Sequence, residues 1–201
     1  SSDVCSSDLD KDVIYIGATT SRDVPKIMAI ASQGSSLYIY EISPEMIQGK
    51  KGTICSGYWE LTPETGLVEG KLPVATSAYF DRMFYYAVGN KIYRADLTRS
   101  TPRSYEIYAH PDPSVRITRL KFRSQREDRW DISGGDEVEA IPYDFVSYLG
   151  GVAEYPDGNC SMLEMKLTAA GEIDKEEGTK DLMVYEFKGF KNVVDFVYAF
   201  K

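Results

Sequence analysis

The stretch that decides the fold reads FYYAVGNKIYRAD, from Phe84 to Asp96. Two runs rich in aromatic and aliphatic residues, Met83–Val88 and Lys91–Ala95, flank Gly89-Asn90. Gly and Asn tolerate the positive φ angles that a two-residue hairpin turn requires. The stretch therefore predicts a β-hairpin, whose paired residues are Val88 with Lys91, Ala87 with Ile92, Tyr86 with Tyr93 and Tyr85 with Arg94.

Both faces of this hairpin are largely apolar. Because side chains alternate along a strand, one face carries Phe84, Tyr86, Val88, Tyr93 and Ala95, and the other carries Met83, Tyr85, Ala87, Ile92 and Arg94. A sheet with one face in water alternates between apolar and polar residues, whereas a sheet packed on both faces need not. The pattern is typical of stacked sheets, as in a β-sandwich or in the blades of a β-propeller.

The order of strands around the hairpin repeats along the chain. One unit consists of Val74–Phe80, the two hairpin strands and Ser104–Tyr108, and the next consists of Val115–Phe122, Phe145–Tyr155, Ser161–Leu167 and Leu182–Phe187. The units start 41 residues apart, and four strands per period of about 40–50 residues is typical of propeller blades. Lys26–Leu61 fits a preceding unit, and Val193–Phe200 is predicted to be the first strand of a further one. The sequence thus predicts an all-β fold, a β-propeller fragment of four-stranded antiparallel blades.

Two stretches of the second unit carry more specific expectations. Val115–Phe122 alternates, which places Val115, Ile117, Arg119 and Lys121 on one face of a strand. Arg123–Asp144 is charged and contains Gly134-Gly135, so it is predicted to be a long surface loop or a partly disordered insertion.

The composition excludes several classes of function. The chain has 31 acidic and 23 basic residues, a net charge of −8 and no basic cluster, which argues against nucleic-acid binding. No apolar run approaches the ~20 residues that span a bilayer.

One His and no CxxC pair argue against a zinc site, and we expect no metal and no cofactor. Cys55 and Cys160 could pair, but two buried free thiols fit better.

The first nine residues, SSDVCSSDL, look like the translation of a sequencing-library adapter whose last codons read Asp-Val-Cys-Ser-Ser-Asp-Leu. We therefore expect Ser1–Leu9 to be an artefact and exclude it from fold reasoning. On this interpretation residues 10–201 are the C-terminal part of a longer protein. Cys5 is then neither a native cysteine nor a lipid-anchor cysteine.

Three segments carry a resemblance to a known family: the hairpin Phe84–Asp96, the strand Ile117–Phe122 (ITRLKF) and the terminal Gly189–Lys201 (GFKNVVDFVYAFK). Together they resemble the PKD-like family lipoproteins of Gram-negative gut anaerobes. The resemblance implies an upstream PKD-like β-sandwich followed by a C-terminal propeller. It also implies export and a lipid anchor at the outer membrane or cell surface, often beside glycan-uptake proteins. The anchor is missing from this chain, and the resemblance implies no catalytic residues.

No catalytic constellation is evident in the sequence. His110, the single His, lies in the loop His110–Pro113 and is predicted to be a surface residue rather than a base. The acids of the charged segment are predicted to be solvated, because glycosidases need two carboxylates at a fixed separation. Asp157-Gly158-Asn159 resembles part of a calcium loop, but a tight turn explains it.

The candidate ligand-binding residues are Trp130, Tyr143 and Trp59, because sugar rings stack on exposed aromatic faces. Trp130 lies in the charged segment, where burial is hard to arrange, whereas Trp59 lies on a predicted strand and fits a core position as well. The hypothesis is a non-enzymatic cell-surface domain that binds a glycan or a partner of the uptake system. The alternatives are a propeller-type polysaccharide hydrolase or lyase, with convergent acids at a central channel, and a structural scaffold.

Overall fold

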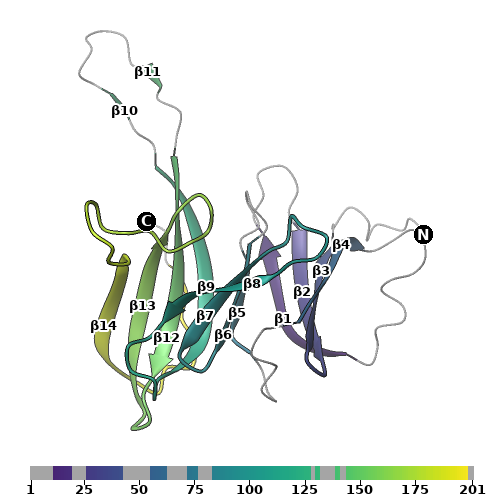
Figure 1. Cartoon of the computed structure of the whole chain (residues 1–201), viewed down its shortest axis with the longest axis horizontal. Coiled ribbons are helices and arrows are strands. Elements are labelled where there is room, and N and C mark those ends of the chain that lie inside the picture. The colour runs from purple at the N-terminus through teal and green to yellow at the C-terminus, as the bar shows by residue number, and fades with distance from the viewer. Residues whose placement is uncertain are drawn as a thin grey trace.

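The regular structure of the part that is described consists of β-strands, without a helix. The structure is a computed structural model and describes residues 11–19, 26–42, 55–62, 72–76, 83–127, 130–131, 139–140 and 144–198. Within these ranges the strands form three four-stranded antiparallel sheets, together with one two-stranded ribbon (Figure 1). No helix in these ranges is long and apolar enough to cross a membrane. The prediction of an all-β fold built from four-stranded antiparallel units is therefore confirmed.

In each four-stranded sheet, the hydrogen-bonded order of the strands follows their order in the chain. Sheet A contains β1 (Asp12–Thr19), β2 (Lys26–Gln33), β3 (Ser36–Ile42) and β4 (Cys55–Leu61). Sheet B contains β5 (Val74–Thr76), β6 (Met83–Val88), β7 (Lys91–Asp96) and β8 (Ser104–Ala109). Sheet C contains β9 (Arg116–Glu127), β12 (Asp144–Glu154), β13 (Asn159–Leu167) and β14 (Val184–Lys191). The ribbon pairs β10 (Trp130–Asp131) with β11 (Glu139–Ala140).

The hairpin β6–β7 has the predicted register. Val88 pairs with Lys91, and the pairing continues to Tyr85 with Arg94. Gly89 has φ 59°, in the left-handed region that the turn needs.

Sheet B is packed on both faces, as predicted. Phe84, Tyr86, Tyr93 and Ala95 face a core shared with sheet A. Met83, Tyr85, Ala87 and Ile92 face a second core, shared with sheet C. The two apolar faces of the hairpin thus form two different sheet–sheet contacts, one with sheet A and one with sheet C.

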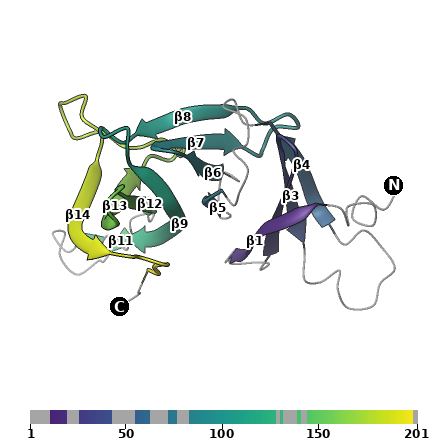
Figure 2. The same ribbon diagram turned by 90° about the horizontal axis from the view of Figure 1, so that it is seen from below.

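The three sheets follow one another along an arc. Figure 2 shows the last strands β4, β8 and β14 on the outer side of this arc, and the first strands β1, β5 and β9 toward its inside. After each outer strand the chain returns to the inside to begin the next sheet. The loop from β8 to β9 is held by two bonds to the hairpin turn: His110 N donates to Asn90 O at 2.9 Å, and Ile117 N donates to Gly89 O at 2.8 Å.

The predicted faces of β9 are wrong beyond Ile117. Val152 pairs with Arg119 and Ala153 pairs with Ile117, so Thr118 is an extra residue in the ladder. Such a β-bulge reverses the inward and outward positions that follow it. Ile117 and Leu120 therefore both enter the core shared with sheet B.

Two boundary predictions in sheet C are also wrong. The charged segment Arg123–Asp144 is predicted to be a surface loop or a partly disordered insertion, but β9 extends to Glu127 and pairs with the start of β12 at Asp144. Residues 128–129, 132–138 and 141–143 of this segment lie outside the described part. The ribbon β10–β11 then continues outward from the sheet (Figure 1). A strand was expected at Val193–Phe200, yet residues 193–198 belong to no strand. Residues 199 and 200 lie outside the described part.

Candidate functional site

The structure does not bring the three sequence-predicted aromatic residues together. Trp130 lies in the ribbon beyond sheet C, paired with Ala140 through the backbone, and its side chain is outside the described set. Tyr143 lies outside the described residues. Trp59 lies on β4 in sheet A with 7% of its surface exposed, within the core shared with sheet B. This burial favours the core role for Trp59 that the sequence left open.

A pocket of about 420 Å³ lies instead at the end of sheet C where β13 begins. Its wall is formed by Tyr155, Asp157, Asn159, Cys160, Ser161, Lys188 and Gly189, here called the β13–β14 pocket. The β12–β13 turn closes one side, because Tyr155 N donates to Asn159 O at 2.9 Å and Gly158 N donates to Tyr155 O at 3.0 Å. Asn159 N also donates to Asp157 Oδ1 at 3.0 Å, as the sequence's tight turn requires.

A β-bulge between β13 and β14 opens this end of sheet C. Cys160 pairs with Phe190 but Ser161 pairs with Lys188, so Gly189 is an extra residue. Gly189 has φ 104°, a conformation that side-chain-bearing residues rarely adopt. Bulges redirect neighbouring side chains and occur beside functional sites. The bulge sets Ser161 and Lys188 across from each other at the pocket wall.

Ser161 is the buried polar group of the pocket. Only 1% of its surface is exposed, and its Oγ has no hydrogen-bond partner of good geometry among the described residues. The Ser161 hydroxyl lies near enough to Tyr155 and Glu186 to lower the pKa of both, but without good hydrogen-bond geometry to either it can still bond a ligand or a water at the pocket wall. Cys160 beside it is a buried free thiol, as the sequence analysis favoured.

A cluster of polar side chains lies behind the pocket, here called the His110 cluster: His110, Tyr108, Tyr155, Ser161 and Glu186. Tyr155 Oη donates to Glu186 Oε1 at 2.8 Å, and His110 Nε2 lies 3.8 Å from the same oxygen. His110 Nδ1 accepts from Asp112 N at 3.1 Å, which leaves Nε2 as the ring nitrogen that carries a hydrogen toward Glu186. The rings of Tyr108 and Tyr155 meet the imidazole edge to face.

His110 is therefore not the surface residue that the sequence predicted. It is 6% exposed, and Asn90 Nδ2 donates to its carbonyl oxygen at 2.9 Å. The loop docks on the hairpin turn and places the imidazole between sheets B and C. Its carboxylate partner, Glu186, is 76 positions away in the chain, so no local sequence pattern could have identified the pair.

The pKa of Glu186 reflects its neighbours. Burial raises this pKa, but the hydroxyls of Ser161 and Tyr155 and the nearby Lys188 and His110 outweigh burial and hold the pKa below its ordinary value. Burial, with the charge of Glu186, raises the pKa of Tyr108 to about 12. Glu186 is thus a carboxylate acceptor, and the tyrosines are neutral donors, across the neutral pH range.

Replacing Glu186 by Gln should destabilise the fold in a pH-dependent way. Because the folded pKa lies below 4.5, the carboxylate's contribution is present above that pH and is lost as the pH falls through the folded value. We expect a lower melting temperature for Glu186→Gln than for the original chain at neutral pH, and convergence of the two in acid. Thermal unfolding across pH measures this, with Glu177→Gln in an exposed turn as control. A gap that persists unchanged in acid would refute the assignment.

The arrangement suits hydrogen bonding to a ligand better than nucleophilic catalysis. A serine hydrolase needs the serine beside the histidine and an acid on the other ring nitrogen. Here a backbone N–H occupies Nδ1, and Nε2 faces Glu186. Among the described residues, no group of three or more His, Cys, Asp or Glu side chains could hold a metal ion.

Comparisons of the chain with family models, with curated proteins and with solved structures give no match.

Proposed function

We propose that the chain is part of a β-propeller and binds a glycan, without catalysing a reaction, in the β13–β14 pocket. The propeller proposal is supported by the inner-to-outer order of strands in each sheet and by the return of the chain to the inside after each outer strand. The stacking of sheet B on both neighbours through apolar faces supports it further. The resemblance adds the cellular setting, a lipid-anchored protein of a glycan-uptake system at the outer membrane or cell surface.

One observation carries the binding proposal: the buried Ser161 hydroxyl, which makes no hydrogen bond of good geometry to its neighbours Tyr155 and Glu186, lies at the wall of a polar pocket. A sugar hydroxyl both donates and accepts, so it could satisfy Ser161 Oγ. Lys188, with 73% of its side chain exposed, offers a cationic donor at the rim. Tyr155 offers part of an aromatic surface of the kind on which sugar rings pack. The pocket is large enough for one or two sugar units by the usual size of ligand sites.

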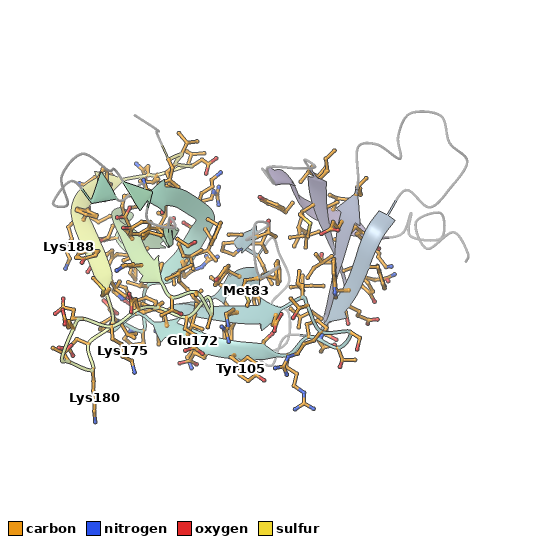
Figure 3. All side chains as sticks on the ribbon, turned by 90° about the horizontal axis from the view of Figure 1, so that it is seen from above. Met83, Tyr105, Glu172, Lys175, Lys180 and Lys188 are labelled. Atoms are coloured by element: carbon orange, nitrogen blue, oxygen red, sulfur yellow. The ribbon has the colours of Figure 1, made fainter. Side chains whose placement is uncertain are left out.

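The test is a glycan array of bacterial, plant and mucin polysaccharides, followed by calorimetric titration of the glycans that bind. Ser161→Ala and Lys188→Ala should each weaken binding about 3- to 10-fold, since a net hydrogen bond contributes about 0.5–1.5 kcal/mol. Lys180→Ala removes the same charge from a residue that does not line the pocket, and should leave binding unchanged; Figure 3 shows Lys180 apart from Lys188. Binding that survives both pocket variants, or no binding by a folded protein, would contradict the proposal.

A further inference from the structure

Tyr155 supplies the aromatic part of the β13–β14 pocket wall, and three contacts hold it in place. Its backbone N donates to Asn159 O at 2.9 Å, which fixes the residue just after β12. The imidazole of His110 meets its ring edge to face, with the centroids 6.0 Å apart. Its hydroxyl donates to Glu186 Oε1 at 2.8 Å. The first two contacts belong to the turn and to the junction of sheets B and C, so the hydroxyl contact can be removed without disturbing either.

Glu186 reaches Tyr155 from the outer strand of the sheet. It lies on β14 opposite Leu163 of β13, and 26% of its side chain is exposed. Its second oxygen, Oε2, lies 3.8 Å from Lys188 Nζ. Glu186 is not among the residues that line the pocket, yet its carboxylate lies between the aromatic wall and the cationic rim.

The contact with Tyr155 is the stronger of these two. A hydroxyl that donates to a carboxylate at 2.8 Å makes a charge-assisted hydrogen bond. An ion pair at 3.8 Å, to a Lys whose side chain is 73% exposed, is weak because water screens it. Glu186 therefore acts on the pocket mainly through the Tyr155 hydroxyl.

We propose that Glu186 is a positioning residue of the β13–β14 pocket, which holds the Tyr155 ring in the orientation on which a sugar packs. A ring that is already fixed loses no rotamer freedom when a sugar stacks on it. Without the carboxylate, the sugar itself must order the ring, and this weakens binding. The proposal rests on the binding function proposed above and adds to it a residue that does not touch the glycan.

Nuclear magnetic resonance of tyrosine labelled with carbon-13 at Cζ tests the contact without any glycan. The chain has 15 tyrosines, and the Tyr155 signal is the one that disappears in Tyr155→Phe. Glu186→Ala should move this signal, because the hydroxyl loses its acceptor. Glu186→Gln should return the signal close to its original position, because an amide oxygen accepts the same bond. Glu177→Ala, in an exposed turn, is the control and should leave the signal where it is.

Calorimetry tests the effect on binding, with the array glycan that has the highest affinity for the original chain. Glu186→Ala should weaken binding by about 2- to 10-fold, the cost of ordering one side chain. Glu186→Gln should recover most of this loss, and Glu177→Ala should bind as the original chain does. A residue that only supports the fold would lower the melting temperature in both Glu186 variants without this difference in affinity.

A double-mutant cycle shows whether Glu186 acts through Tyr155. In Tyr155→Phe the hydroxyl is already absent, so adding Glu186→Ala should weaken binding no further. An equal loss in both backgrounds would overturn the proposal, because Glu186 would then act on the glycan by another route. A Tyr155 signal that stays in place in folded Glu186→Ala would overturn it too. Circular dichroism verifies that each variant folds, and Glu186→Ser replaces Glu186→Ala if that variant does not.

The outcomes separate the positioning role from the binding function. Glycan binding that weakens in Ser161→Ala and Lys188→Ala, but is unchanged in Glu186→Ala, would overturn the positioning role and leave the binding function in place. Absence of glycan binding by the folded original chain would overturn both.

Discussion

Replacing Phe84 by Ala is expected to lower the free energy of unfolding by about 3–5 kcal/mol. Phe84 has none of its surface exposed, and it lies in the core between sheets A and B. Its ring also stacks on Tyr86, with centroids 5.8 Å apart. Removing the ring leaves a cavity between two sheets, which cannot collapse without moving one of them.

The same loss is expected on the opposite face of the hairpin. Ile92 is also fully buried, but in the core between sheets B and C, so Ile92→Ala should lower the free energy by about 2–5 kcal/mol. Tyr105→Ala at the exposed outer strand should change it by less than about 1 kcal/mol. Urea unfolding measures all three. A large loss at only one of the two buried positions would show that sheet B is packed on one face only.

Gly171→Ala is expected to destabilise the fold by about 3 kcal/mol, through two separable effects. Gly171 has φ +73°, which strains any residue with a side chain. Its carbonyl oxygen accepts a hydrogen bond from the buried Tyr85 Oη at 3.0 Å. A Cβ atom here would lie 2.8 Å from that hydroxyl and 3.0 Å from Met83 Cγ, so the loop must move away from sheet B.

Gly178 provides a matched control for the backbone effect alone. It has φ +76° in the following turn, and a Cβ atom would meet nothing within 4 Å. Gly178→Ala should therefore cost only about 1 kcal/mol, the ordinary penalty for the left-handed conformation. Figure 3 shows Met83 of sheet B close to Glu172, next to Gly171, where the loop crosses from sheet C. Equal losses at the two glycines would mean that the loop does not pack on sheet B as described.

The strand content and the hairpin could be predicted because both depend on local patterns. Gly89-Asn90 determines the turn, the turn determines the register, and alternation then assigns each side chain to a face. No local sequence pattern marks the bulge at Thr118. An extra residue in a strand reverses which side chains face inward after it, but it leaves the composition of the strand unchanged. The end of β14 was missed because the strand continues through Gly189, a residue that usually argues for a turn.

The candidate site was harder to predict than the fold. Trp130 and Tyr143 are predicted from residue type alone, and their side chains lie outside the described part of the chain. The β13–β14 pocket depends on the bulge at Gly189 and on contacts between His110, Ser161 and Glu186, which come from three separate stretches. Nothing in the sequence marks Ser161 as buried at a pocket wall, because that property arises only when the strands are in register.

The central claim is that the chain binds glycans through the β13–β14 pocket, and a direct comparison of two double variants tests it. Affinity for a glycan that binds the original chain should be measured by calorimetry for Ser161→Ala/Lys188→Ala and for Trp130→Ala/Tyr143→Ala. We predict that the first pair weakens binding by at least about tenfold and that the second leaves binding close to that of the original chain. Loss of binding in the second pair, with the first unchanged, would contradict the claim and place the site on the aromatic residues of the charged segment.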